Sequence, residues 1–251
     1  MSSAWKLPKL SLLLLLAGAL AGCRVQSTPI VKPTEAPIIM QAILTNPEAG
    51  ESLEPNQNVS VTGTVQGNCP ATVVVRLLNH LGEIVNESNP QTSTEKQACT
   101  WETNLLNPLA DGIHGWIVVV LTSALDSSLW SSDAIPVISG NPQSGPFVTI
   151  TNPEPYQTIA SETMTISGRG GALFENHLVV QVEDEQGTIL ASAPVTLDAQ
   201  EMGEEGEWHI MLSIPVSGDK PGRIVAFANS PKDGSLLTNF AIPILFSSPS
   251  P

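Results

Sequence analysis

Serine, histidine and acidic side chains are the residues of this sequence that could catalyse hydrolysis. A serine hydrolase brings a hydroxyl nucleophile, a histidine base and a carboxylate within hydrogen-bond reach. The chain has many serines and the histidines His80, His114, His177 and His209, but no Gly-x-Ser-x-Gly elbow. It also has no phosphate-binding Gly-x-x-x-x-Gly-Lys-Ser/Thr loop, His-Glu-x-x-His pair or Gly-x-Gly-x-x-Gly turn. We predict no catalytic residue and no cofactor, and a hydrolase with a dispersed site is the alternative.

Two groups of acidic residues are candidates for binding cations. They are Glu183-Asp184-Glu185 and Glu201, Glu204, Glu205 and Glu207. An EF-hand calcium loop needs alternating Asp or Asn ligands, a central glycine and a closing glutamate, and that order fails here. We interpret both groups as solvated hairpin tips and predict no metal site, with calcium binding as the alternative.

The first 22 residues have the three parts of a secretory signal. Lys6 and Lys9 precede an apolar run, which is followed by small residues. Residues 10–22 are fewer than the roughly 20 apolar residues that span a bilayer. They end on Leu20-Ala21-Gly22-Cys23, which resembles the bacterial lipobox. The resemblance implies cleavage before Cys23, a lipid such as palmitate on this residue, and a permanent anchor through two acyl chains. An ordinary cleavable signal is the alternative.

Cys69 and Cys99 are the cysteines left after Cys23. An even pair in an exported chain predicts a disulfide. It would close a loop of about 30 residues and stabilise the fold by roughly 3–4 kcal/mol in the chain-entropy model. A metal site is the weaker alternative, because the pair has no Cys-x-x-Cys spacing and no nearby histidine cluster.

The sequence repeats itself once, roughly 106 positions apart, which indicates a duplicated domain. Ile43-Leu44-Thr45-Asn46-Pro47-Glu48 recurs as Thr149-Ile150-Thr151-Asn152-Pro153-Glu154, and Trp101 recurs as Trp208. Ala134-Ile135-Pro136-Val137 recurs as Ala241-Ile242-Pro243-Ile244. We predict a signal peptide (1–22), the lipidated cysteine with a flexible Pro/Ser/Thr spacer (23–40), two domains (41–140 and 146–247) and a tail (248–251).

Each repeat reads as a series of short strands. Apolar residues alternate at Val59 and Val61, and denser runs such as 73–75 and 117–120 suit strands of a sandwich core. We therefore predict an all-β chain of two tandem immunoglobulin-like β-sandwiches. Trp101 and Trp208 are expected in the cores. Pro136 and Pro243 predict that the final strand of each domain lies at a sheet edge.

The second repeat resembles the Gmad2 family, an immunoglobulin-like domain of bacterial sporulation and germination proteins and other envelope lipoproteins. The matching residues are Ile150, Pro153, Ile166-Ser167-Gly168, Phe174-Glu175, Asp184 to Gly187, Gly206-Glu207-Trp208, Ser230 to Ser235, and Ile242-Pro243-Ile244. The first repeat is a diverged copy, which has Gly67 to Pro70 where the second has Phe174-Glu175. We interpret Phe174 and Glu175 as a core residue with a cap, and the alternative is that they are binding contacts.

The net negative charge and the predicted export limit the functions that we expect. The net charge of −14 opposes binding to nucleic acid or anionic lipid. We predict a non-catalytic, lipid-anchored binding or adaptor protein outside the cytoplasm, on the cell membrane or on an outer membrane. Its partners are the membrane, through the Cys23 lipid, and an envelope protein or glycan. A structural or accessory envelope component linked to sporulation or spore germination is the alternative.

Overall fold

The computed structural model describes residues 40–66, 72–95, 98–122, 129–142, 144–215 and 218–247. The predicted signal peptide, Cys23, Cys69 and the tail lie outside these ranges, and so does the predicted spacer except for Met40, so the predictions for them stay predictions. Strands dominate the described ranges, which confirms the all-β prediction. No helix in these ranges has the length and hydropathy of a membrane span.

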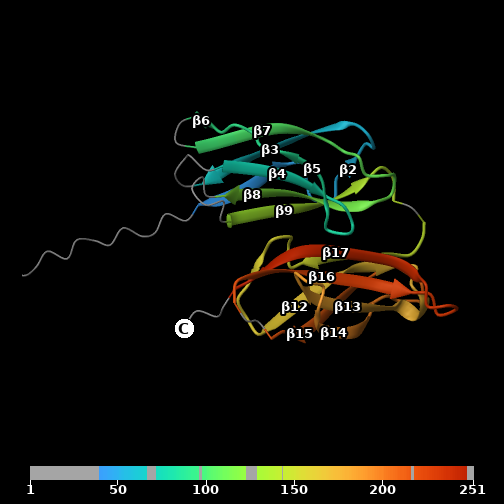
Figure 1. The fold of residues 1–251 in the computed structure, drawn as a ribbon. Helices are drawn as coiled ribbons and strands as arrows, with labels where there is room; N and C mark the ends of the chain where they lie inside the picture. The colour runs from blue at the N-terminus through green and yellow to red at the C-terminus, as the bar shows by residue number, and fades with distance from the viewer. Residues whose placement is uncertain are drawn as a thin grey trace, which may run out of the picture. The chain divides into compact units, whose positions relative to one another are not determined.

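The first β-sandwich (blue to green in Figure 1) runs from Gln41 to Ser139. One sheet has the order β1-β3-β7-β6, and the other has the order β2-β9-β8-β4-β5. Neighbouring strands are antiparallel except for β2 and β9. The strands are β1 (Gln41–Asn46), β2 (Ser52–Leu53), β3 (Asn58–Gln66), β4 (Thr72–Leu78), β5 (Ile84–Ser88), β6 (Ser93–Glu95), β7 (Ala98–Leu106), β8 (His114–Thr122) and β9 (Leu129–Ser139).

The second β-sandwich (yellow to red in Figure 1) repeats this topology. Its sheets have the orders β10-β12-β15 and β11-β17-β16-β13-β14, so each of its strands has a counterpart in the first sandwich. Among the described residues, β6 of the first sandwich has no counterpart in the second. Its elements are β10 (Phe147–Asn152), β11 (Thr158–Ile159), β12 (Thr163–Gly171), the 3-10 turn η1 (Phe174–Asn176), β13 (His177–Asp184), β14 (Ile189–Thr196), β15 (Gly206–Ser213), β16 (Lys220–Asn229) and β17 (Leu236–Phe246).

The repeated Thr-Asn-Pro-Glu segment has the same structural role in both sandwiches. The side-chain amide of Asn46 donates to the Ser60 carbonyl at 2.6 Å. The amide of Asn152 donates to the Thr165 carbonyl at 3.0 Å. Each asparagine thus links the end of the first strand to the neighbouring strand of its own sheet. The motif recurs because both copies need this strand end to be held.

A glycine packed against a tryptophan is repeated in both cores. Gly63 pairs with Trp101 between β3 and β7, and Gly168 pairs with Trp208 between β12 and β15. A Cβ on either glycine would overlap the indole ring and a backbone carbonyl oxygen. Both tryptophans are buried, as predicted. The small residue is therefore required by the approach of the ring.

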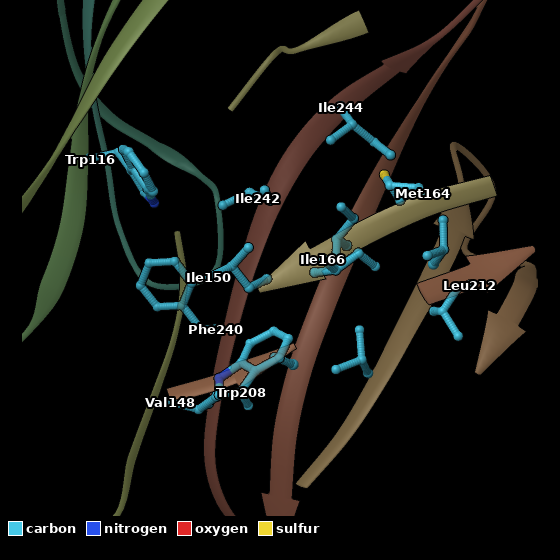
Figure 2. Close-up of a cluster of buried hydrophobic side chains, with 14 of the residues drawn as sticks. Trp116, Val148, Ile150, Met164, Ile166, Trp208, Leu212, Phe240, Ile242 and Ile244 are labelled. Carbon is cyan, nitrogen blue, oxygen red and sulfur yellow. The ribbon is translucent and has the colours of Figure 1, made fainter. Parts of the chain in front are cut away.

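Strands β4 and β8 are buried on both faces. On β8, Ile117, Val119 and Leu121 belong to the core of the first sandwich. The alternate residues Trp116, Val118 and Val120 belong to a hydrophobic cluster with the core residues of the second sandwich, part of which is drawn in Figure 2. The run of consecutive apolar residues in β8 is thus explained by burial on both faces, because protein also covers the outer face of the strand. We call this contact between the two sandwiches the seam.

Two polar contacts accompany the seam. The backbone N–H of Ala241 in β17 donates to the His80 carbonyl at 2.7 Å. The Arg76 guanidinium lies 5.3 Å from the centre of the Tyr156 ring, in a cation–π contact. Both sandwiches belong to one compact unit.

The final strands, which contain Pro136 and Pro243, are not the outermost strands of their sheets. β9 and β17 were predicted at sheet edges, but the two-residue strands β2 and β11 lie outside them. These short strands pair only with Ile138–Ser139 and with Leu245–Phe246. At the prolines, the outward carbonyls accept single hydrogen bonds, from Gly50 N–H to Pro136 and from Tyr156 N–H to Pro243, each 2.7 Å long. Each proline is thus at a position where no neighbouring strand needs its missing N–H.

Replacing Cys99 by serine tests the predicted disulfide. Cys99 is buried in β7, whereas Cys69 lies outside the described residues. We expect the Cys99→Ser variant, and the reduced wild type, to lose about 3–4 kcal/mol of unfolding free energy, because the unfolded chain regains the entropy of the closed loop. Denaturant titration with and without reductant measures the loss. An unchanged midpoint under reduction, with both thiols titratable in the native protein, would rule the bridge out.

Candidate binding site

Three connections of the second sandwich meet at one end of it. They are residues 172–176 between β12 and β13, 197–205 between β14 and β15, and 230–235 between β16 and β17. The pairing places them together, because Gly170 opposes Gly206, His177 opposes Thr196, and Asn229 opposes Leu236. We call the surface formed by these three connections the loop end. It contains Phe174 and Glu175, the candidate contacts predicted from the sequence.

Asn176 fixes the first two connections to each other. Its side-chain amide donates to the Glu201 carbonyl at 3.1 Å, and its side-chain oxygen accepts the Gly203 N–H at 2.8 Å. Its own carbonyl accepts the Leu197 N–H at 2.8 Å. Asn176 is 7% exposed and has a φ of 58°, a conformation that asparagine tolerates better than most residues. The loops on both sides of it are therefore held in one arrangement.

Large apolar side chains are exposed at the loop end. Phe174 is 54% exposed and Met202 is 77% exposed. Leu236, which begins β17 directly after the third connection, is 57% exposed. The interpretation of Phe174 as a core residue is therefore wrong, because the 3-10 turn η1 carries its side chain outward while Leu173 and Asn176 are buried. A binding role for Phe174 and Glu175 stays a prediction. Single exposed apolar residues are common on protein surfaces, whereas several at one place indicate a contact surface.

The charges around these apolar residues are mostly negative. Glu175, Glu201 and Glu204 are exposed there. The Glu175 carboxylate lies 3.8 Å from the His177 imidazole. Arg169 forms an ion pair with Glu205 at 2.9 Å, so its positive charge is balanced. The loop end therefore offers apolar contact area within a negative electrostatic field.

The first acidic group differs from its interpretation as a solvated tip. Glu183 is buried and forms an ion pair with Arg223 at 2.6 Å. Asp184 accepts the N–H groups of Gln186 and Thr188, so it shapes the hairpin turn. Within the described residues, no three His, Cys, Asp or Glu side chains are grouped so that they could hold a metal ion.

A cleft of about 580 Å³ lies at the seam. His114 of β8 stacks on Phe147 of β10 in its lining, with ring centres 5.7 Å apart. Asp111 and Ser144 also line the cleft, which brings a carboxylate, an imidazole and a hydroxyl into one place. However, Asp111 accepts the Asn141 N–H at 3.0 Å. A loop hydrogen bond and a ring stack are structural contacts, so this cleft gives the hydrolase alternative no support.

Two histidines at the seam predict that stability depends on pH. Burial lowers the pKa of His80 below its ordinary value of 6.5, against the opposing effect of Glu83. Burial likewise lowers the pKa of His114, where Glu205 opposes the shift and Arg169 adds to it. Below 6.5 the unfolded chain then binds more protons than the folded chain. The stabilisation is complete above that pH and is lost as the pH falls through the lowered pKa values.

Thermal unfolding of the wild type and of the His80→Gln/His114→Gln variant measures this effect. We expect the wild type to lose more stability than the variant between about pH 7.5 and about pH 5.5. Other groups titrate in both proteins, so the difference between them isolates the two histidines. Parallel pH profiles for the two proteins would exclude the expected role.

Most of the second sandwich matches one known protein family. Residues 147–235 match Gmad2. This family is described as the immunoglobulin-like domain of bacterial spore germination. The matched residues include all three connections of the loop end and stop just before β17. No curated protein matches the chain.

Solved structures with similar chains come from diverse proteins. The fibronectin(III)-like modules of CbhA from Clostridium thermocellum are 18% identical, with 82% of this chain and 94% of that chain covered and a TM-score of 0.27. A marsupial T cell receptor is 10% identical, with 82% and 73% covered and a TM-score of 0.28. A structure of three titin domains is 11% identical, with 82% and 65% covered and a TM-score of 0.24. These low similarities have no bearing on function.

The sequence did not identify two residues of the loop end. Met202 lies among acidic residues in a segment without apolar periodicity, and its exposure could not be read from the sequence. Asn176 directly follows the Phe-Glu pair, but its role depends on Glu201 and Gly203, which are distant in sequence. A buried asparagine at positive φ is the structural sign that both connections are held together.

Proposed function

We propose that this protein is a non-catalytic binding module of the bacterial cell envelope, anchored by a lipid on Cys23, and that the loop end of its second sandwich contacts another envelope component. The exposure of Phe174 and Met202 on loops that Asn176 holds in place is the observation that carries this proposal. When a partner covers large apolar side chains on an ordered surface, their removal from water favours binding.

The germination link comes from the matched family. Gmad2 is described as a domain of bacterial spore germination, so an envelope role in germination is the setting that the match supports. A passive spacer is a second candidate, and the seam favours it. An apolar seam that makes one compact unit of two sandwiches would hold a distal surface at a fixed distance from the membrane.

Crosslinking in intact cells tests the proposal. The wild-type protein, on its own anchor, is treated with a chemical crosslinker, and captured proteins and glycans are identified by mass spectrometry. A Cys23→Ala variant is the control, because it removes the proposed lipid and changes no residue of either sandwich. A defined component captured only by the anchored form is the expected result. No capture above the control would contradict binding and would leave the spacer.

A further inference from the structure

The exposed apolar side chains of the loop end lie on two loops that are joined by their backbones. The Ala172 N–H donates to the Gly203 carbonyl at 3.1 Å, next to Phe174 in one loop and Met202 in the other. Asn176 adds the two side-chain hydrogen bonds described above. Phe174 and Met202 thus stand on a single ordered platform. Leu236 and Leu237 begin β17 at the same end and are also exposed.

The backbone of this platform is fixed in an unusual conformation. Ala172, Glu175 and Asn176 have φ angles of 54°, 51° and 58°. Each left-handed residue other than glycine disfavours the folded state by about 1 kcal/mol or more, so surrounding contacts must hold it. A platform that is already ordered loses little conformational entropy when a partner binds.

The charges at the loop end select the kind of partner. The acidic residues Glu175, Glu201 and Glu204 would repel the anionic surface of a membrane, so a lipid surface is disfavoured as the cover for Phe174 and Met202. In the third connection, Lys232 and Asp233 are both exposed and their charges cancel, so the loop end stays net negative. A partner segment with lysine or arginine complements this field, and apolar side chains in that segment would cover the exposed residues.

We infer that the loop end binds a basic protein segment in which lysine or arginine residues accompany large apolar side chains. The inference rests on the proposed function and names the class of partner. Phe174 and Met202 are the apolar contacts, and Glu175 and Glu201 are the charge-complementary contacts. Asn176 is a positioning residue that acts through the loops it joins.

Selection from a library of displayed random peptides against the mature chain, with Cys23 replaced by serine, tests this inference. We expect the enriched peptides to combine lysine or arginine with large apolar residues. Their affinity should fall about tenfold or more in a Phe174→Ser/Met202→Ser variant, in a Glu175→Lys/Glu201→Lys variant, and on addition of salt. Met211→Ser is the matched control, since Met211 is 70% exposed on β15 away from the loop end, and binding should persist in it.

Circular dichroism confirms that each variant is folded before its affinity is compared. Failure to enrich basic, apolar peptides would overturn the inference, as would binding that is equal in the wild type and both loop-end variants. The proposed function would fail through a different result, which is that crosslinking in cells captures no component above the control. If crosslinking in cells captures a partner whose binding ignores both variants, the binding module stands and this assignment of its contact surface is wrong.

Discussion

Replacing Gly168 by alanine is expected to lower the unfolding free energy by about 3 kcal/mol, at the upper end of the range for overpacking a core. The added Cβ would lie 2.6 Å from Cζ2 of Trp208 and would also overlap the Thr149 carbonyl oxygen. Backbone on one side and a buried indole on the other leave no flexible atom to move. For a unit of this size, the loss corresponds to a drop in Tm of roughly 6–12 °C.

The repeat supplies an independent copy of this experiment. Gly63→Ala would bring a Cβ against the Trp101 ring and the Ile43 carbonyl oxygen, and it should destabilise the first sandwich similarly. Gly145→Ala is the matched control, because no atom lies within 4 Å of its added Cβ. Differential scanning calorimetry of the three variants gives the comparison. A Gly168→Ala protein as stable as the Gly145→Ala protein would contradict the close packing described for the glycine and the ring.

Replacing Trp116 by alanine is expected to remove about 3–5 kcal/mol and to separate the unfolding of the two sandwiches. Trp116 is 2% exposed and lies on the outer face of β8, in the cluster that contains Phe240 of β17 (Figure 2). A cavity at this position would weaken the seam and leave the inner core of the first sandwich in place. Calorimetry should therefore show two transitions where the wild type shows one.

A Trp116→Phe variant separates packing from hydrogen bonding. Among the described residues, the buried Nε1 of Trp116 has no hydrogen-bond partner. The substitution by phenylalanine would therefore reduce the packed volume without breaking a hydrogen bond. We expect a loss well below that of Trp116→Ala. Trp208→Phe would in addition leave the Arg169 carbonyl without the 3.2 Å hydrogen bond that it accepts from the indole. An unchanged single transition in Trp116→Ala would show that the seam does not couple the sandwiches.

The fold was largely predictable because its signals are local and repeated. Strand alternation, the Asn-Pro segments and the recurrence of Trp101 as Trp208 depend on short stretches of chain, and the structure confirms what they indicated. The seam was not predicted. A run such as Ile117–Val120 shows that both faces of a strand are apolar, but periodicity does not reveal which part of the protein covers the second face.

The candidate site was predicted only in part. Phe174 and Glu175 were singled out, but a sequence does not show whether a phenylalanine beside an acid points into the core or outward. That choice depends on the 3-10 turn and on Asn176, whose partners Glu201 and Gly203 are brought near by the folding of another connection. Glu183 was misplaced for the same reason, since its partner Arg223 lies on a different strand.

Site-specific photo-crosslinking in intact cells tests the central claim most directly. A photo-reactive amino acid is placed at position 174 on the loop end or at position 211 on β15, in the otherwise unchanged full-length protein. Both native side chains are exposed, at 54% and 70%, so neither replacement should disturb the core. The account predicts that position 174 captures a defined envelope component and that position 211 does not. Capture at position 211 alone, or at neither position, would contradict a binding role for the loop end.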